Sequence, residues 1–388
     1  MAAYDVTTAG VSLNFDTQNN NYNSCFKIDD THIINFWMGE NGNDGYAQVF
    51  TINTSTWAVT TAAARLEFDT VNGENNGCTK IDDNHFINFW TGELADGFAQ
   101  VFTVNTSTWA VTTAAARLEF DTVNYQGGSC HLIDSNHVIN FWQGNASDGF
   151  AQVFTVNTST WAVTTAATSL EFDTVGPSLS DALGIKSCQI DDNHFITFWR
   201  GASDLGLTQT FTVNTSTWAV TTAAARLEFD SAGGGNWNSC FKIDDTHIIN
   251  FWAEASGNDG FVQVFTVNTS TWAVTTAAAR LEFDIVNGAF NSCYQVDSTH
   301  FINFWRGGSG DGFVQTFTIN TSTWAVTTAA AALEFDTQNN QANSCFQIDT
   351  NHFINFWSGG TGALGYTQIF NVELPAVAQN TGNFFALI

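Results

Sequence analysis

The sequence predicts an all-β fold in which seven repeated four-stranded units close into a ring. The phrase NTSTWAVTTAA occurs six times, with its tryptophans 52 to 57 residues apart, and an adjacent Phe-Trp pair occurs seven times. Residues 4–16, YDVTTAGVSLNFD, match the repeated WAVTTAAARLEFD with Tyr4 in the place of the tryptophan. The chain thus starts with the final segment of a repeat, and its last repeat stops near Val372, where the WAVTTAAARLEFD segment would follow. A closed ring explains this offset, and we expect residues 4–9 to be the outermost strand of a unit built from residues 343–372.

Residues 74–122 show the order of elements within one unit. The short run GCTKID precedes the turn Asp-Asp-Asn-His, whose side chains favour tight turns by bonding their own backbone. HFINFWTG is an aromatic and β-branched run too short for a helix, and a polar segment ending in Asp96-Gly97 turns the chain into FAQVFTVN. NTST then leads into WAVTTA, the fourth strand. We interpret AAARLEFDT as the crossover to the next unit, with Leu118 and Phe120 packed between units.

Seven four-stranded units closed by a shared terminal unit describe a seven-bladed β-propeller. We assign residues 1–373 to the propeller and residues 374–388 to a C-terminal tail. Each blade resembles a kelch-type repeat in its parts, here CTKI, HFINFWTG, FAQVFTVNTST and Trp109, although the glycine pair of that signature is not kept. In amino-acid sequence, the segments IDDNHFINFW and DGFAQVFTVNTSTWAV also resemble repeats of predicted virion structural proteins of marine bacteriophages. That resemblance implies a structural role in a virion and brings no catalytic motif with it.

The composition narrows the classes of partner. The net charge is −27 with only ten Lys and Arg, which argues against nucleic acid and against anionic membrane surfaces, because both need clustered cations. Since no run of 18 apolar residues occurs, we expect no membrane insertion. The N-terminus MAAYDVTT has neither a basic region nor an apolar run, so we expect no secretory signal.

The cysteines and the turn histidines each recur once per repeat. Seven cysteines in equivalent positions do not form a disulfide framework, and we expect buried free thiols. The Asp-Asp-[Thr/Asn]-His turn places one histidine in each unit, and we expect these rings to be structural, as in the His–Trp networks of WD-repeat blades. Equivalent residues of different blades lie too far apart to share an ion, so no metal and no other cofactor is expected.

Catalytic signatures are missing from the sequence, and we predict that the protein is not an enzyme. Neither a GxSxG elbow, an HExxH motif nor a P-loop occurs, and NTSTW lacks the Asp and Gly of a sialidase Asp-box. The segment from Gly39 to Gly45 only loosely matches a calcium loop, and its counterpart in the next repeat contains Leu and Ala.

The seven copies differ mainly at one rim. The Asp-Asp-Asn-His and Asn-Thr-Ser-Thr turns hardly change, whereas the loops after the Phe-Trp pair and the crossovers before the cysteines change in every unit. In a propeller these two sets share one face. Variation confined to one face suggests a scaffold that displays a recognition surface, while unconstrained drift is the alternative explanation.

The fourth unit is the most divergent. Its crossover is the longest and contains Pro177, and its Cys-to-His spacing is six residues rather than seven. Cys188 should therefore face the opposite side of its strand and be the first thiol to react. Rare cations and non-repeating aromatic residues on this face form a candidate contact set for a glycan or protein. The candidate ligand-binding residues are Tyr125, Lys186, Arg200, Trp237 and Arg306.

These observations favour a non-enzymatic virion structural and recognition protein, such as a phage appendage or decoration protein with a host-surface or glycan-binding face. Its partners would be other virion proteins and a host-surface glycan or protein, and its location the virion, assembled in the host cytoplasm. The alternatives are a bacterial protein-interaction propeller and a glycan-active propeller enzyme. The tail ends in apolar residues that we expect to be buried, either against the propeller or as an assembly anchor. These candidate anchor residues are Phe384, Phe385, Leu387 and Ile388.

Overall fold

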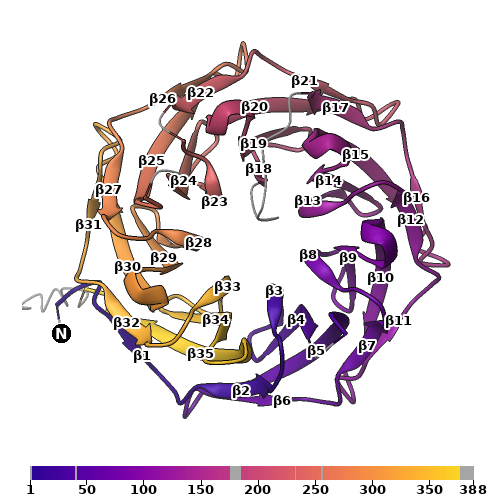
Figure 1. Ribbon diagram of the computed structural model, residues 1–388, viewed down its shortest axis with the longest axis horizontal. Helices are drawn as coiled ribbons and strands as arrows, with labels where there is room; N and C mark the ends of the chain where they lie inside the picture. Colours follow the sequence, from indigo (N-terminus) through magenta and orange to yellow (C-terminus); the bar gives the residue numbers. More distant parts are fainter. Residues whose placement is uncertain (1, 40–41, 175–184, 232, 255–256, 376–388) are drawn as a thin grey trace, which may run out of the picture.

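The computed structural model is a closed seven-bladed β-propeller, as the repeat predicts (Figure 1). It describes residues 2–39, 42–174, 185–231, 233–254 and 257–375. Each blade is an antiparallel sheet whose main path has four strands, running from the central axis to the outer edge. A short fifth strand from the crossover pairs with the third strand in every blade.

The first three blades follow one another along the chain. Blade 1 contains β3 (Asn21–Asp29), β4 (His32–Gly39), β5 (Asp44–Asn53), β6 (Ala58–Thr61) and β7 (Leu66–Asp69). Blade 2 contains β8 (Glu74–Lys80), β9 (His85–Thr91), the 3-10 turn η1 (Glu93–Ala95), β10 (Gly97–Val104), β11 (Val111–Thr113) and β12 (Leu118–Asp121). Blade 3 contains β13 (Gln126–Asp134), β14 (His137–Gln143), η2 (Asn145–Ser147), β15 (Gly149–Val156), β16 (Val163–Thr165) and β17 (Leu170–Asp173).

The remaining blades repeat this order. Blade 4 contains β18 (Lys186–Gln189), β19 (His194–Arg200), η3 (Ala202–Asp204), β20 (Gly206–Val213), β21 (Val220–Thr222) and β22 (Leu227–Asp230). Blade 5 contains β23 (Asn236–Lys242), β24 (His247–Ala253), β25 (Gly260–Val267), β26 (Val274–Thr276) and β27 (Leu281–Asp284). Blade 6 contains β28 (Ala289–Asp297), β29 (His300–Arg306), η4 (Gly308–Gly310), β30 (Gly312–Ile319), β31 (Val326–Thr328) and β32 (Leu333–Asp336). Blade 7 contains β33 (Gln341–Gln347), β34 (His352–Gly359), β35 (Leu364–Val372), β1 (Val6–Thr8) and β2 (Leu13–Asp16).

The ring closes through the N-terminal segment, as predicted. Strand β1 pairs antiparallel with β35, with Val6 opposite Val372, and β2 pairs with the same strand. In Figure 1 the indigo β1 lies beside the yellow strands of the last blade. Phe15 of β2 packs edge-on against Phe356 of its own blade and against Trp37 and Phe50 of blade 1. The N-terminal strands therefore complete blade 7 and join its core to blade 1.

The crossovers do more than connect the blades. The predicted plug residues Leu118 and Phe120 belong to a short strand, β12, and lie in one apolar cluster with residues of blades 2 and 3. Each of these short crossover strands ends in an aspartate. Its carboxylate accepts a hydrogen bond from the indole of the next blade's Phe-Trp pair, as in Trp90 Nε1 to Asp69 Oδ2 (2.9 Å). All seven Phe-Trp pairs make this bond, so each blade is tied to its neighbour both by packing and by a buried polar contact.

The seven turn histidines are structural, as the sequence indicates. His85 donates from Nδ1 to the Asp82 carboxylate (2.9 Å), and its ring stacks on Trp161 of the next blade with ring centroids 3.5 Å apart. That tryptophan has a left-handed backbone (φ 61°), a conformation that a non-glycine residue rarely adopts. Each of the seven turn histidines makes the equivalent stack, with Tyr4 replacing the tryptophan in blade 7. The stack accounts for the recurrence of both residues.

The two variable segments share one face, as predicted. In blade after blade, a backbone N–H of the crossover donates to a carbonyl of the loop between the second and third strands, as in Gly73 N to Asn43 O (2.7 Å) and Tyr125 N to Ala95 O (2.8 Å). The turns that hardly change lie at the other ends of the strands. We call the face formed by the crossovers and these loops the variable face.

Candidate functional site

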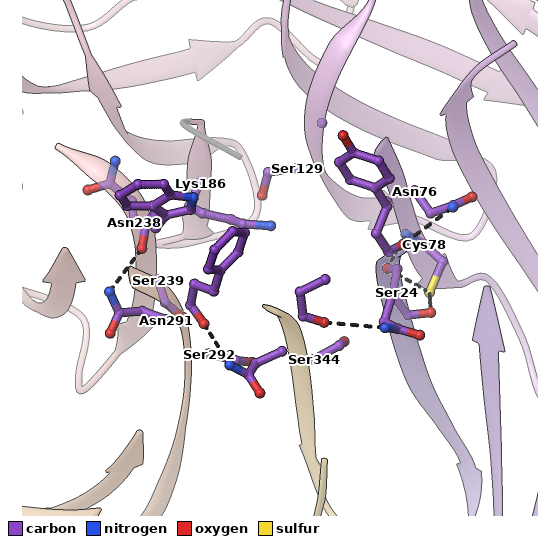
Figure 2. Close-up of a pocket in the computed structure, with 18 of the residues that line it drawn as sticks. Ser24, Asn76, Cys78, Ser129, Lys186, Asn238, Ser239, Asn291, Ser292 and Ser344 are labelled. Atoms are coloured by element: carbon purple, nitrogen blue, oxygen red, sulfur yellow. Dashed lines mark hydrogen bonds between the residues drawn. The ribbon is translucent and has the colours of Figure 1, made fainter. Parts of the chain in front are cut away.

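A cavity of about 200 Å³ lies on the propeller axis, between the beginnings of the inner strands (Figure 2). Each inner strand directly follows a crossover, so the cavity is at the variable face. Successive residues of the inner strands form rings around the axis, and the typical order is a left-handed residue, Asn, Ser and Cys. The seven blades depart from this order at individual positions, and these departures give the cavity its chemistry.

The asparagine ring is part of the scaffold. Asn76 accepts a hydrogen bond from Asn88 of the neighbouring strand (2.8 Å) and donates to the carbonyl oxygen of Gly73 (2.7 Å). It also donates to the carbonyl of Tyr22 in the previous blade (3.3 Å). These bonds fix the backbone around the left-handed residue that precedes each inner asparagine. They therefore also fix the direction of that left-handed residue's side chain. The amide groups are therefore engaged with protein.

The serine ring is more available to a ligand. Ser24, Ser239 and Ser344 each lie with Oγ 3.3–3.4 Å from the thiol of the next blade's cysteine. Each Oγ also accepts the backbone N–H of that cysteine. Because sulfur is a weak acceptor, the hydroxyl hydrogen can turn to a stronger acceptor in the cavity. The ring thus presents several hydroxyl donors to the axis.

Blade 4 interrupts the rings, as its shorter Cys-to-His spacing predicts. Ser187 pairs with Thr197 at the position where the other six blades pair a cysteine with an asparagine. The shift of one residue places Lys186 in the serine ring and Ile185 in the asparagine ring. Figure 2 shows the Lys186 side chain extending into the cavity. Burial lowers the pKa of its ammonium group, against the opposite influence of the Cys240 and Cys130 thiols.

Aromatic side chains occupy the left-handed positions on part of the ring. Trp237 (φ 47°) and Phe290 (φ 54°) have ring centroids 5.3 Å apart, and both line the cavity together with Tyr22 (φ 52°). The Trp237 Nε1 is buried and has no acceptor among the described residues. The cavity therefore combines an aromatic wall with hydroxyl groups and one ammonium group.

The structure brings only part of the predicted contact set together. Lys186 and Trp237 both line the cavity. Arg200 is tied to its own loop through Asp204 and donates to Asn236 Oδ1 (3.1 Å). Arg306 lies with its guanidinium carbon 6.0 Å from the centre of the Phe290 ring, next to the aromatic wall rather than in the cavity lining.

Tyr125 belongs to the core. It is fully buried, and its hydroxyl accepts a hydrogen bond from Asn140 (3.4 Å), a role that the inner asparagine plays in most blades. The inner asparagine is replaced here by Gly128, where a Cβ would lie 1.9 Å from the tyrosine oxygen. Blade 3 thus has a glycine in place of the inner asparagine, and the Tyr125 hydroxyl takes over the hydrogen bond to Asn140. The tyrosine cannot reach a ligand without moving.

The cysteines, all within the described residues, are free thiols. The predicted shift of Cys188 is confirmed, since it pairs with Ile196 rather than with the Thr197 position. Its expected accessibility is wrong: Cys188 is only 5 % exposed and belongs to an apolar cluster with residues of blade 5. Both sides of an inner strand are covered by neighbouring blades, so reversing a side chain exchanges one buried environment for another.

Exposed aliphatic side chains lie in the segments that form the variable face. Val71, Val123, Ile285 and Val286 lie in the crossovers and Leu94 in a loop, with exposed fractions between 51 % and 83 %. The residues proposed as an assembly anchor (384, 385, 387 and 388) lie outside the described residues. In the described ranges, no group of three or more His, Cys, Asp or Glu is arranged to hold a metal ion. Nor does the described part of the chain contain a helix with the length and apolar character needed to cross a membrane.

Comparisons with known proteins support the fold. No protein-family model matches the chain, and no curated protein is significantly similar to it. Among solved structures, a candidate 6-phosphogluconolactonase from Bacteroides fragilis is similar at 9 % identity, with a TM-score of 0.59 over 81 % of this chain and 84 % of that one. The SapL1 lectin in complex with alpha methyl fucoside is similar at 7 % identity, with a TM-score of 0.51 over 82 % of this chain and 97 % of the lectin. Sqt1 from Chaetomium thermophilum is 14 % identical, with a TM-score of 0.56 over 92 % of this chain and 88 % of Sqt1.

Proposed function

We propose that the protein is a non-enzymatic recognition module of a virion, and that it binds a host-surface glycan at the axial cavity of its variable face. The observation that carries this proposal is the composition of the cavity. An aromatic wall of Trp237 and Phe290 lies next to serine hydroxyls, on the one face where the repeats differ. A sugar ring offers the matching surfaces, since it has apolar C–H faces and a rim of hydroxyl groups.

The size of the cavity supports a small group as the ligand. Its volume of about 200 Å³ is below the range of roughly 300–1,000 Å³ that is usual for drug-sized ligands. A terminal sugar residue suits such a cavity better than a peptide segment does. That the SapL1 lectin shares this fold is in keeping with a glycan as ligand.

The lining also supports binding rather than glycan cleavage. Hydrolysis of glycosidic bonds usually needs two carboxyl groups about 5–9.5 Å apart across the bond. Among the described residues that line the cavity there is neither an Asp nor a Glu. The assignment to a virion is supported by the resemblance of the repeats to phage structural proteins.

A protein-interaction propeller of bacterial origin is the second candidate, favoured by the exposed aliphatic residues of the variable face. Binding of the purified protein to a glycan array separates the two candidates. We expect one family of related glycans to bind and Trp237→Ala to weaken that binding roughly thirtyfold, as truncation of a central aromatic anchor commonly costs about 2 kcal/mol. Leu94→Ala, on the same face but in a loop, is the matched control and should bind normally.

Two results would contradict the proposal. If no glycan binds, or if Leu94→Ala weakens binding as much as Trp237→Ala does, the cavity is not a glycan site. Mass spectrometry of purified virions tests the location separately. Absence of the protein from virions, together with its presence in uninfected bacterial cells, would favour the interaction propeller.

A further inference from the structure

One position of the cavity wall differs in charge from all its equivalents. The serine ring consists of Ser24, Gly77, Ser129, Lys186, Ser239, Ser292 and Ser344. Five of these seven residues are serine, so the repeat itself shows that a small neutral side chain satisfies the scaffold here. The lysine of blade 4 is the one charged residue in this ring.

The other lysines of the inner strands have partners that Lys186 lacks. Lys242 donates from Nζ to the carbonyl oxygen of Ile190 (2.5 Å) and pairs with Asp245 (2.9 Å). Lys27 and Lys80 make the equivalent bonds, each to a carbonyl oxygen of the preceding blade and to an aspartate three residues further along the chain. For Lys186 the described residues provide neither an acceptor nor a carboxylate.

The Lys186 side chain is half-buried, so its ammonium group loses part of its hydration in this position. Removing a charge from water is unfavourable unless a counter-charge or several acceptors replace the water. Of the described residues lining the cavity, Lys186 is the only charged one, although the whole chain carries a net charge of −27. The cavity is thus a local positive site within an acidic protein.

Further donors point to the same kind of ligand. As donors, the hydroxyls of Ser239 and Ser344 reach only thiol sulfur atoms, which are weak acceptors, among the described residues. An ammonium group and several hydroxyls gathered around one cavity are all hydrogen-bond donors, and a compact oxyanion accepts from all of them.

We infer that the axial cavity binds an oxyanion carried on a sugar, a carboxylate or a phosphate, with Lys186 as its charged ligand. The inference rests on the proposed glycan site and names the class of sugar: acidic rather than neutral. The aromatic wall contacts the ring of the sugar, while Lys186 and the serine hydroxyls bind its anionic group.

Titration calorimetry with four probes tests the inference: glucuronate, glucose 6-phosphate, glucose and inorganic phosphate. The wild-type protein should bind glucuronate or glucose 6-phosphate at least tenfold more tightly than glucose. Lys186→Ser, which restores the residue of five other blades, should abolish this preference, because a hydrogen bond to a charged group contributes roughly ten- to hundredfold in affinity. Lys242→Gln is the matched control: it removes the same charge, takes the residue found at Gln189, Gln295 and Gln347, and should keep the preference.

The melting temperature gives a second readout that a structural lysine would not reproduce. Without ligand, Lys186→Ser should melt at or above the wild-type temperature, since it removes a half-buried charge that has no partner among the described residues. A lower melting temperature together with an unchanged preference for the acidic probes would overturn the inference. Inorganic phosphate binding as tightly as glucose 6-phosphate would overturn the sugar as the carrier. Equal binding of glucose and glucuronate by the wild-type protein would overturn acidic specificity but leave the proposed glycan site standing, whereas failure of all the sugars would overturn both.

Discussion

Deletion of residues 1–16 should open the ring and cause aggregation. The deletion removes β1 and β2 from blade 7 and leaves β35 as an exposed edge with unpaired backbone groups, which is a template for pairing with other chains. It also uncovers the apolar cluster between blades 7 and 1, in which Leu13 and Phe15 pack against Trp37 and Phe50.

The size of the effect follows from the lost contacts. Val6 is buried and Leu13 and Phe15 are partly buried, so at about 1.5–3 kcal/mol for a fully buried side chain their burial contributes up to roughly 9 kcal/mol together. Loss of Asp16 leaves the buried Trp37 Nε1 without its acceptor, at a further cost of about 1–3 kcal/mol. The sum is comparable to the whole stability of a typical domain, about 5–15 kcal/mol.

The assay combines light scattering after size-exclusion chromatography with thermal melting by circular dichroism. We expect the truncated protein to elute as aggregates, and a synthetic peptide of residues 1–18 added during refolding to restore a monomer. Phe15→Ala and Phe68→Ala change the same position in the closing blade and in blade 1, and they should lower the melting temperature by similar amounts. A soluble truncated monomer with an unchanged melting temperature would refute the closure argument.

Four further predictions follow from the blade contacts and the sequence. Burial alone would raise the pKa of Asp82, but hydrogen bonds from turn N–H groups and from His85 hold it below its usual 3.8; the stabilisation is therefore present above about pH 4 and lost as the pH falls through the lowered pKa. Asp82→Asn should consequently lower the melting temperature at pH 7 and have a progressively smaller effect as the pH falls below 4, and an effect that is the same over this whole range would contradict this account. Trp90→Phe removes the buried indole bond to the preceding blade and should cost about 1–3 kcal/mol in chemical denaturation, whereas a neutral result would show that the bond does not join the blades. A thiol reagent should label few of the cysteines in the native protein, and Cys188 should not be the first to react. If residues 383–388 are an assembly anchor, their removal should reduce incorporation into virions without changing the melting temperature.

Much of the fold could be predicted because each blade repeats one solution to the same packing problem. The alternation of strands and turns, the offset of Tyr4 and the structural histidines are all visible as repeated letters. The direction of Cys188 was also predictable, because a one-residue change in spacing reverses every side chain of a strand. Its burial was not predictable, since it depends on the blades on both sides.

The site was harder to predict because its residues are recognised only through three-dimensional register. Lys186 and Trp237 stood out by composition, but only the pairing of β18 with β19 shows that the lysine replaces a serine. Phe290 was missed because an aromatic residue in so aromatic a chain carries little signal. Tyr125 was misleading for the opposite reason: its rarity in the repeat marks a local repacking with Gly128, not a contact surface.

The most direct test of the account is a crystal structure of the protein soaked with the glycan that binds best on the array. The account predicts electron density for a terminal sugar in the axial cavity, with its ring against Trp237 and its anionic group within hydrogen-bond distance of Lys186 Nζ. A glycan bound only to the outer loops or between blades, with the cavity unchanged, would contradict it.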